Sequence, residues 1–134
     1  MKKTIAICIP CFNEESNIDQ LYNRIIKVIN YIDDYSFSIL FEDNCSTDNT
    51  LQIIKYLASI DKRVGYISNL ANFGFVRSSA NILLAPDADA NILLLSDLQD
   101  PPEEIPKLIY EWEHSDSQVV FAVRKSSKEN SILF

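Results

Sequence analysis

Polar side chains that could hold a phosphate-bearing ligand or a metal ion gather after four short apolar segments of the sequence. The four polar groups occupy positions 13–15, 42–44, 69–72 and 96–100. Carboxylates brought together repel one another unless a cation or a hydrogen-bonding ligand lies among them. A hard divalent cation takes oxygen ligands and is commonly shared with substrate phosphates. The set as a whole therefore predicts a site for a metal-bound phosphate ligand, although each residue alone could equally cap a helix or form a turn.

Short apolar runs predict the strands that must carry these polar groups. Each run is bounded by polar or turn-forming residues, as expected of a buried strand. The predicted strands are 4–9, 37–41, 64–67, 92–95 and 119–123.

Four helices are predicted between the strands. Ser16 is the expected N-cap of the first helix, whose apolar residues recur at helical spacing. Thr47 or Asp48 is expected to cap the second helix, and the third is expected over roughly 76–85. The fourth is expected to begin at 101–104, where the missing N–H of proline is harmless.

Strands and helices thus alternate along the chain, which predicts an α/β fold with a mostly parallel sheet flanked by helices on both faces. Such sheets bind ligands outside the carboxyl ends of their strands, so the four polar groups should converge at one edge of the sheet. We expect a single domain over residues 1–134, because the sequence shows no linker, internal repeat or low-complexity segment.

Composition and charge exclude several classes of protein. Hydrophobic residues make up 47% of the chain and charged residues 23%, as in soluble globular proteins. A formal net charge of −7 argues against a nucleic-acid backbone or an anionic membrane surface as the main partner. No apolar run approaches the ~20 residues of a membrane helix, and the first is too short for a signal peptide. We therefore expect a cytoplasmic protein with no nucleic-acid partner.

Four motifs, in matching order and spacing, resemble those of family 2 glycosyltransferases. Residues 9–15 (IPCFNEE) resemble the family's IPxYNE opening, and residues 43–50 (DNCSTDNT) resemble its DDGSTDGT loop. Residues 72–74 (NFG) resemble its NxG segment, and residues 96–103 (SDLQDPPE) resemble its DADLQDPPE signature. That signature is typical of the polyprenyl-phosphate branch, which includes dolichol-phosphate mannose synthases. The resemblance covers nearly all of the chain.

This resemblance implies a GT-A fold, a nucleotide-diphosphate sugar as donor, and Mg²⁺ or Mn²⁺ as cofactor. The implied activity is inverting sugar transfer to a polyprenyl phosphate or a growing glycan, in cell-surface polysaccharide or glycolipid synthesis. By motif position, the nucleotide would be bound by Pro10, Phe12, Glu14, Asp43, Asn72 and Arg124. The metal would be held by Asp97, Gln99 and Asp100. Similar proteins use uridine and guanosine donors, so the base, the sugar and the acceptor stay open.

The sequence departs from these motifs at two positions. Asn44 replaces the second acid of the loop motif, and Leu95 stands where the signature has its first Asp. With Asp97 as the remaining acid, a metal should bind weakly without the nucleotide, since the diphosphate must supply further oxygens.

The chain also ends soon after Arg124, whereas similar proteins continue with an acceptor-binding half and, in many cases, membrane helices. We therefore expect the donor-binding part of a longer protein, without its general base. On this expectation the chain alone transfers no sugar, because nothing remains to hold the acceptor in line with the anomeric carbon. Membrane association through the missing part and a homo-oligomeric state stay open.

Three other functions fit parts of the sequence. The two departures favour a nucleotide-binding module without catalysis. A thioredoxin-like site could use Cys8 and Cys11, although Cys8 lies inside a predicted strand and acidic neighbours would raise a thiol pKa. A zinc site could add Cys45 and His114, although His114 lies far along the chain.

Overall fold

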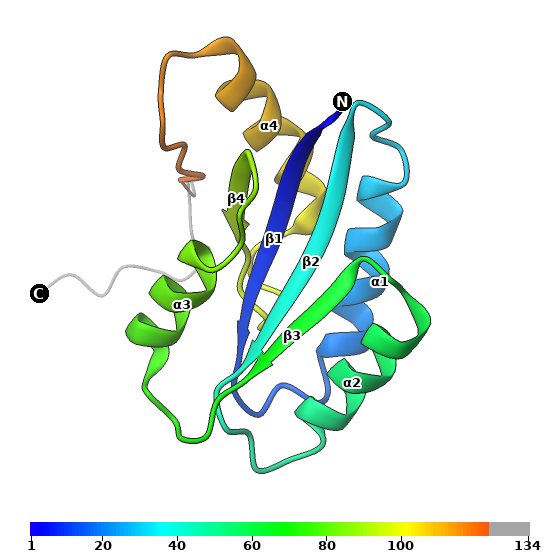
Figure 1. Ribbon diagram of the computed structural model, residues 1–134, viewed down its shortest axis with the longest axis vertical. Coiled ribbons are helices and arrows are strands. Elements are labelled where there is room, and N and C mark those ends of the chain that lie inside the picture. The colour runs from blue at the N-terminus through cyan, green and yellow to red at the C-terminus, as the bar shows by residue number, and fades with distance from the viewer. Residues whose placement is uncertain (124–134) are drawn as a thin grey trace, which may run out of the picture. The chain divides into compact units, whose positions relative to one another are not determined.

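The computed structural model describes residues 1–123, and residues 1–103 form a compact unit around a parallel sheet (Figure 1). Its strands are β1 (Lys3–Cys11), β2 (Tyr35–Asp43), β3 (Val64–Ser68) and β4 (Ala90–Leu93). They lie in the order β3-β2-β1-β4, and every neighbouring pair is parallel. The chain therefore moves outward from β1 through β2 to β3 and then returns to the other side of β1. The direction of winding reverses between β1 and β4.

Three helices cover this sheet, and the reversal of winding distributes them over its two faces. They are α1 (Ile18–Ile29), α2 (Thr50–Ile60) and α3 (Phe75–Leu84). Crossovers between parallel strands are right-handed, so connections running in opposite directions lie on opposite faces. In Figure 1, α1 and α2 accordingly lie on one side of the sheet and α3 on the other. The predicted parallel sheet with helices on both faces is confirmed.

The central strand β1 is buried on both faces because both are covered by helices. Side chains alternate along a strand, so Ala6 and Cys8 share one face and the neighbouring isoleucines share the other. Ala6 and Cys8 pack against Ile82 of α3, and all three side chains have no exposed surface. The opposite face presents Ile5, Ile7 and Ile9, which are also fully buried.

Several predicted boundaries are wrong by a few residues. Ser16 does not cap the first helix: α1 begins at Ile18, and the chain before it forms a turn in which the backbone N–H of Asn17 donates to the carbonyl of Glu14. The second helix begins at Thr50, whose backbone N–H donates to Asp48 Oδ1. The fourth strand ends at Leu93, earlier than predicted, because an apolar run does not show where strand pairing stops.

The second unit, residues 104–134, is described as far as residue 123. A 3₁₀ turn, Pro102–Glu104, leads into α4 (Ile105–His114), so the predicted helix near 101–104 exists but its α-helical part begins later. The predicted strand at 119–123 is wrong, because these residues pair with no strand within residues 1–123. β-Propensity describes how side chains fit a paired sheet and does not itself create the pairing. Among the helices of residues 1–123, none has the length and apolar character needed to span a bilayer.

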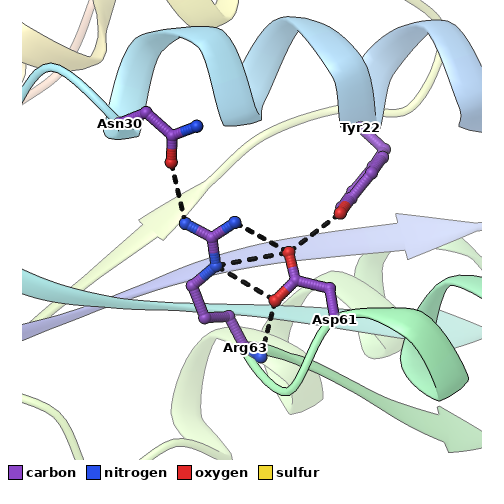
Figure 2. Close-up of polar contacts among 4 residues, drawn as sticks. All are labelled: Tyr22, Asn30, Asp61 and Arg63. Carbon is purple, nitrogen blue, oxygen red and sulfur yellow. Dashed lines mark hydrogen bonds and ion pairs between the residues drawn. The ribbon is translucent and has the colours of Figure 1, made fainter.

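A hydrogen-bonded cluster joins α1 to the turn between α2 and β3 (Figure 2). The Asp61 carboxylate accepts hydrogen bonds from Tyr22 Oη at 2.8 Å and from Arg63 Nη2 at 2.8 Å. Arg63 also donates to Asn30 Oδ1 at 3.0 Å, so it joins the end of α1 to the start of β3. The hydrogen bonds from Arg63 lower the pKa of Asp61 to about 2.

We expect Asp61→Asn to lower the free energy of unfolding by about 1–3 kcal/mol at neutral pH, because Arg63 loses its anionic partner. In the folded chain the pKa of Asp61 is about 2, below its unfolded value of about 3.9. Its contribution is therefore complete above about pH 4 and disappears as the pH falls through the folded pKa. Urea unfolding of both proteins at several pH values measures the difference. The exposed control Asp33→Asn should cost under about 0.5 kcal/mol, and an Asp61 effect that persisted unchanged in acid would contradict the interpretation.

Candidate functional site

Two loops at the carboxyl edge of the sheet are joined by reciprocal hydrogen bonds. Asn13 follows β1 and has a φ of 52°, a left-handed conformation that Asn tolerates better than most residues. Its backbone N–H donates to Ser46 Oγ at 2.9 Å, and its Oδ1 accepts from the backbone N–H of Thr47 at 2.8 Å. The polar groups of these residues therefore form hydrogen bonds between the two motifs.

Further along the same loops, the pattern repeats around Thr50. The backbone N–H of Glu14 donates to Thr50 Oγ1 at 2.8 Å, and that hydroxyl donates to Asp48 Oδ1 at 2.6 Å. Burial opposes the charge on Asp48, but hydrogen bonds from Thr50 and Glu15 outweigh it and lower the pKa of the carboxyl. The backbone N–H of Asn49 donates to Glu15 Oε2 at 2.9 Å. We call this hydrogen-bonded pair of segments, residues 13–15 and 46–50, the paired loops.

A cavity of about 290 Å³ lies beyond the carboxyl ends of β1 and β4, where the strand order reverses. Open parallel sheets bind ligands at this kind of reversal, because the loops on either side of it diverge. The volume lies just below the range that is usual for small-molecule sites, about 300–1,000 Å³. The lining residues are Pro10, Cys11, Phe12, Glu14, Asn44, Asn72, Phe75, Ser78, Leu95, Ser96 and Asp97.

Five of the residues predicted from the motifs lie together around this cavity: Pro10, Phe12, Glu14, Asn72 and Asp97. The lining does not include Asp43, Gln99 or Asp100. Arg124 lies outside the described residues.

In the Asp43 carboxylate, one of the two oxygens accepts a hydrogen bond from the described part of the chain and the other does not. The residue is 1% exposed, and Asp43 Oδ2 accepts a hydrogen bond from the backbone N–H of Ser46 at 3.2 Å. Within residues 1–123, Asp43 Oδ1 is buried without a hydrogen-bond partner. A buried acceptor in this state is costly, so a donor supplied by a ligand would stabilise it. The predicted role of Asp43 stays a prediction.

Other lining residues were not predicted as site residues. Ser96 is 6% exposed and donates to the carbonyl of Pro10 at 3.0 Å, which ties the segment after β4 to β1. Phe75 is 61% exposed and, with Phe12 at 45%, gives the cavity exposed aromatic surface. An exposed aromatic side chain offers a flat surface on which a planar base can stack. Nothing in the sequence marks Ser78 as a residue of the cavity, because its position depends on how α3 packs against the sheet.

The carboxylates at the cavity are too few to hold a metal ion alone. Asp97 is exposed, and its Oδ1 accepts the backbone N–H of Gln99 at 3.0 Å. Leu95, where the signature has an acid, lines the same cavity and offers no oxygen. Across residues 1–123, no group of three or more His, Cys, Asp or Glu side chains could hold a metal ion. The predicted role of Asp97 as a metal ligand stays a prediction, as do those of Gln99 and Asp100.

The structure does not support the thioredoxin-like alternative. Cys8 is fully buried and Cys11 is 2% exposed, and residues three apart in a strand point to opposite faces. Burial raises the pKa of the Cys8 thiol to about 11. Burial also raises the pKa of Cys11 and outweighs a hydrogen bond with Ser96, which lowers it. Redox chemistry needs an accessible thiolate, and neither thiol meets that condition.

Comparison with known proteins agrees with the motifs and the fold. The profile described as "Glycosyl transferase family 2" matches residues 6–133. An uncharacterized glycosyltransferase, YkcC of Bacillus subtilis, is 32% identical and aligns with 92% of this chain. Undecaprenyl-phosphate 4-deoxy-4-formamido-L-arabinose transferase of Proteus mirabilis is 30% identical over 95% of the chain. The chain spans 38% of the length of each relative.

A solved structure shows the same fold. A mannosyltransferase from Pyrobaculum calidifontis, in complex with GDP-Man and Mn²⁺, superposes with a TM-score of 0.70 at 14% identity. The superposition covers 87% of this chain and 34% of that protein. The predicted GT-A fold is therefore confirmed.

Proposed function

The chain belongs to glycosyl transferase family 2, and from this membership we propose that its cavity binds the nucleoside diphosphate of a sugar donor. The observation that carries the proposal is the convergence of Phe12, Glu14 and Asp97 on one cavity at the strand reversal. Phe12 offers a planar apolar surface for the base, and Glu14 offers a carboxylate to a ribose hydroxyl. Asp97 lies where it could help bind the diphosphate through a cation.

This chain spans only part of the length of its relatives. A protein of their full length would transfer the sugar to a polyprenyl phosphate. This is supported by the name of the Proteus mirabilis relative, an undecaprenyl-phosphate transferase, and by the SDLQDPPE form of the signature. A divalent cation, Mg²⁺ or Mn²⁺, would neutralise charge on the leaving nucleoside diphosphate. Asp97 would hold that cation, with Gln99 and Asp100 as further predicted ligands. An acceptor phosphate is already anionic and needs little help from a general base.

Binding of nucleotides to the purified chain tests this proposal. UDP, GDP and their sugar conjugates are added with and without Mn²⁺, and the midpoint of thermal unfolding is measured. Because a ligand that binds the folded state stabilises it, at least one diphosphate should raise the midpoint when Mn²⁺ is present. If no nucleotide shifts the midpoint under either condition, the cavity is not a donor site.

We expect Phe12→Ala to weaken binding of the nucleotide that gives the largest shift, at a cost of about 1–3 kcal/mol for the lost stacking surface. Phe12 is 45% exposed, so the free energy of unfolding should change by less than about 1 kcal/mol. Tyr31→Ala is the matched control, because Tyr31 is an aromatic residue that is 88% exposed and does not line the cavity. Isothermal titration calorimetry gives both affinities. Equal losses in the two variants would show that Phe12 does not contact the base.

A further inference from the structure

Four side chains form a continuous row of hydrogen bonds from the end of β2 to the cavity: Glu42, Asn69, Asn44 and Asn72. Asn69 Nδ2 donates to Glu42 Oε1 at 2.7 Å and to Asn44 Oδ1 at 3.2 Å. Asn44 Nδ2 then donates to Asn72 Oδ1 at 2.9 Å. Glu42 and Asn44 are 1% and 4% exposed, so these bonds replace contacts with water. We call this row the amide chain.

Backbone groups fix the orientation of the Asn44 and Asn72 side chains, and therefore the direction of the bonds to Asn44 Oδ1 and to Asn72 Oδ1. The backbone N–H of Phe73 donates to Asn44 Oδ1 at 3.0 Å, and that of Gly74 donates to Asn72 Oδ1 at 2.8 Å. A backbone N–H can only donate, so the side-chain oxygens of both asparagines must face these groups. If the amide of Asn44 or Asn72 rotated by 180°, its NH₂ group would face the backbone N–H of Phe73 or Gly74, and two donors would meet.

The other end of the amide chain is anchored to α3. Ser78 Oγ donates to Glu42 Oε1 and Asn81 Nδ2 donates to Glu42 Oε2, each at 3.1 Å. Glu42 is thus the common acceptor for three side chains from the β3–α3 loop and from α3. The amide chain therefore connects the end of β2 to both segments that form one wall of the cavity.

Two hydrogen bonds already occupy Asn72 Oδ1, so the amide nitrogen is the group that Asn72 can offer to a ligand. Asn72 lines the cavity, as does Asn44. We propose that the amide chain fixes Asn72 as a hydrogen-bond donor to an acceptor oxygen of the bound nucleotide, with Asn44 as the positioning residue. This inference rests on the proposed function, since it assigns a role to Asn72 toward the same ligand.

The inference accounts for the amide at position 44, where the motif has an acid. An ionised carboxylate there could not donate to Asn72 Oδ1 and would place two oxygens against each other. If Asn72 turned over to relieve this, it would lose its bond with the backbone N–H of Gly74 and present its oxygen to the ligand. The residue at position 44 thus decides whether Asn72 donates or accepts.

Asn72→Asp is the most direct test, because it keeps the oxygen that accepts from Asn44 and Gly74 and replaces only the amide nitrogen with oxygen. We expect the Kd for UDP or GDP, measured by calorimetry with Mn²⁺, to rise about tenfold or more at mildly alkaline pH. Affinity should return toward that of the wild type as the pH falls, because a protonated carboxyl donates again. Asn72 is exposed, so the variant should fold normally.

Asn44→Asp should show the same pH-dependent loss through Asn72, and Asn72→Ala should weaken binding without any added pH dependence. Asn23→Asp, at an exposed position of α1, controls for the added charge alone. The nearby carboxyl groups are Glu14, Glu42, Asp43 and Asp97. These carboxyl groups are present in the wild type and in every variant, so the ratio of variant to wild-type Kd at each pH removes their contribution to the pH dependence.

The outcomes separate the two proposals. If the wild type binds neither UDP nor GDP, the proposed function fails, and the role of Asn72 fails with it. If the wild type binds but Asn72→Asp binds equally well, or is weakened by the same factor at every pH, the nucleotide site stands and the donor role of Asn72 is overturned. If Asn44→Asp does not fold, Asn72→Asp alone still decides the question.

Discussion

Asp97→Asn is expected to abolish the tightening of nucleoside-diphosphate binding by Mn²⁺, while metal-free binding changes little. Asp97 lines the cavity, and the neighbouring Leu95 supplies no oxygen. A cation held by one carboxylate must take its remaining oxygens from the diphosphate, so metal and nucleotide should each strengthen the other's binding by the same factor. Couplings of this kind are typically about 5–150-fold. Calorimetric titration of UDP and GDP, in Mn²⁺ and in a chelator, measures that factor in both proteins.

Two further variants complete this experiment. Leu95→Asp adds the second acid of the signature and should give the free protein a measurable affinity for Mn²⁺, provided that the new carboxyl ionises. Asp87→Asn removes an exposed charge from the turn after α3 and should leave the coupling unchanged. Wild-type affinity that does not depend on Mn²⁺ would show that this cavity binds its ligand without a metal.

Ile82→Ala is expected to have the largest effect on stability, lowering the free energy of unfolding by about 2–5 kcal/mol. Ile82 has no exposed surface and packs between α3 and β1, against Ala6 and Cys8. Ala6 and Cys8 belong to the fully buried strand β1, so they cannot easily move to fill the space that a truncated side chain leaves, and Leu40 and Ala88 also pack against this cluster. Urea unfolding measures the loss.

Ile60→Ala is the matched control, because it removes the same atoms from the end of α2, where Ile60 is 58% exposed. Its cost should stay below about 1 kcal/mol. Because α3 also brings Phe75 and Ser78 to the cavity, saturating nucleotide should recover part of the stability lost in Ile82→Ala. A cost for Ile82→Ala no greater than for the control would mean that α3 is not part of the cooperative core.

Sequence reasoning found the strands of the parallel sheet because a strand buried on both faces reads as a continuous apolar run. It failed for 119–123, where the side chains favour a strand but Val119, Phe121 and Val123 are exposed. Pairing depends on a partner strand, which local composition does not contain. The predicted N-cap at Ser16 is also wrong. The turn before α1 is formed by hydrogen bonds to the carbonyl of Glu14, which the residue types alone do not indicate.

The motifs located the candidate site but did not separate ligand-facing side chains from those that hold the loops. Asn13 and Thr50 belong to the motifs, yet their polar atoms are occupied by bonds between the loops. In the sequence, Asn44 is only a departure from the motif, and the positioning role proposed for it rests on its hydrogen bond to Asn72. Such assignments depend on which donor meets which acceptor in three dimensions.

The paired loops also limit how the length of this region can vary. Backbone N–H groups of one loop meet side chains of the other in both directions, from Asn13 with Thr47 to Glu14 with Thr50. Adding or deleting one residue in either loop would shift these partners out of register together, and several backbone N–H donors would lose their acceptors at once. Related chains should therefore tolerate substitutions here more readily than insertions or deletions. A change in length would be accommodated more easily around the exposed Asp87, because the segment between α3 and β4 lies at the amino edge of the sheet and the paired loops lie at its carboxyl edge.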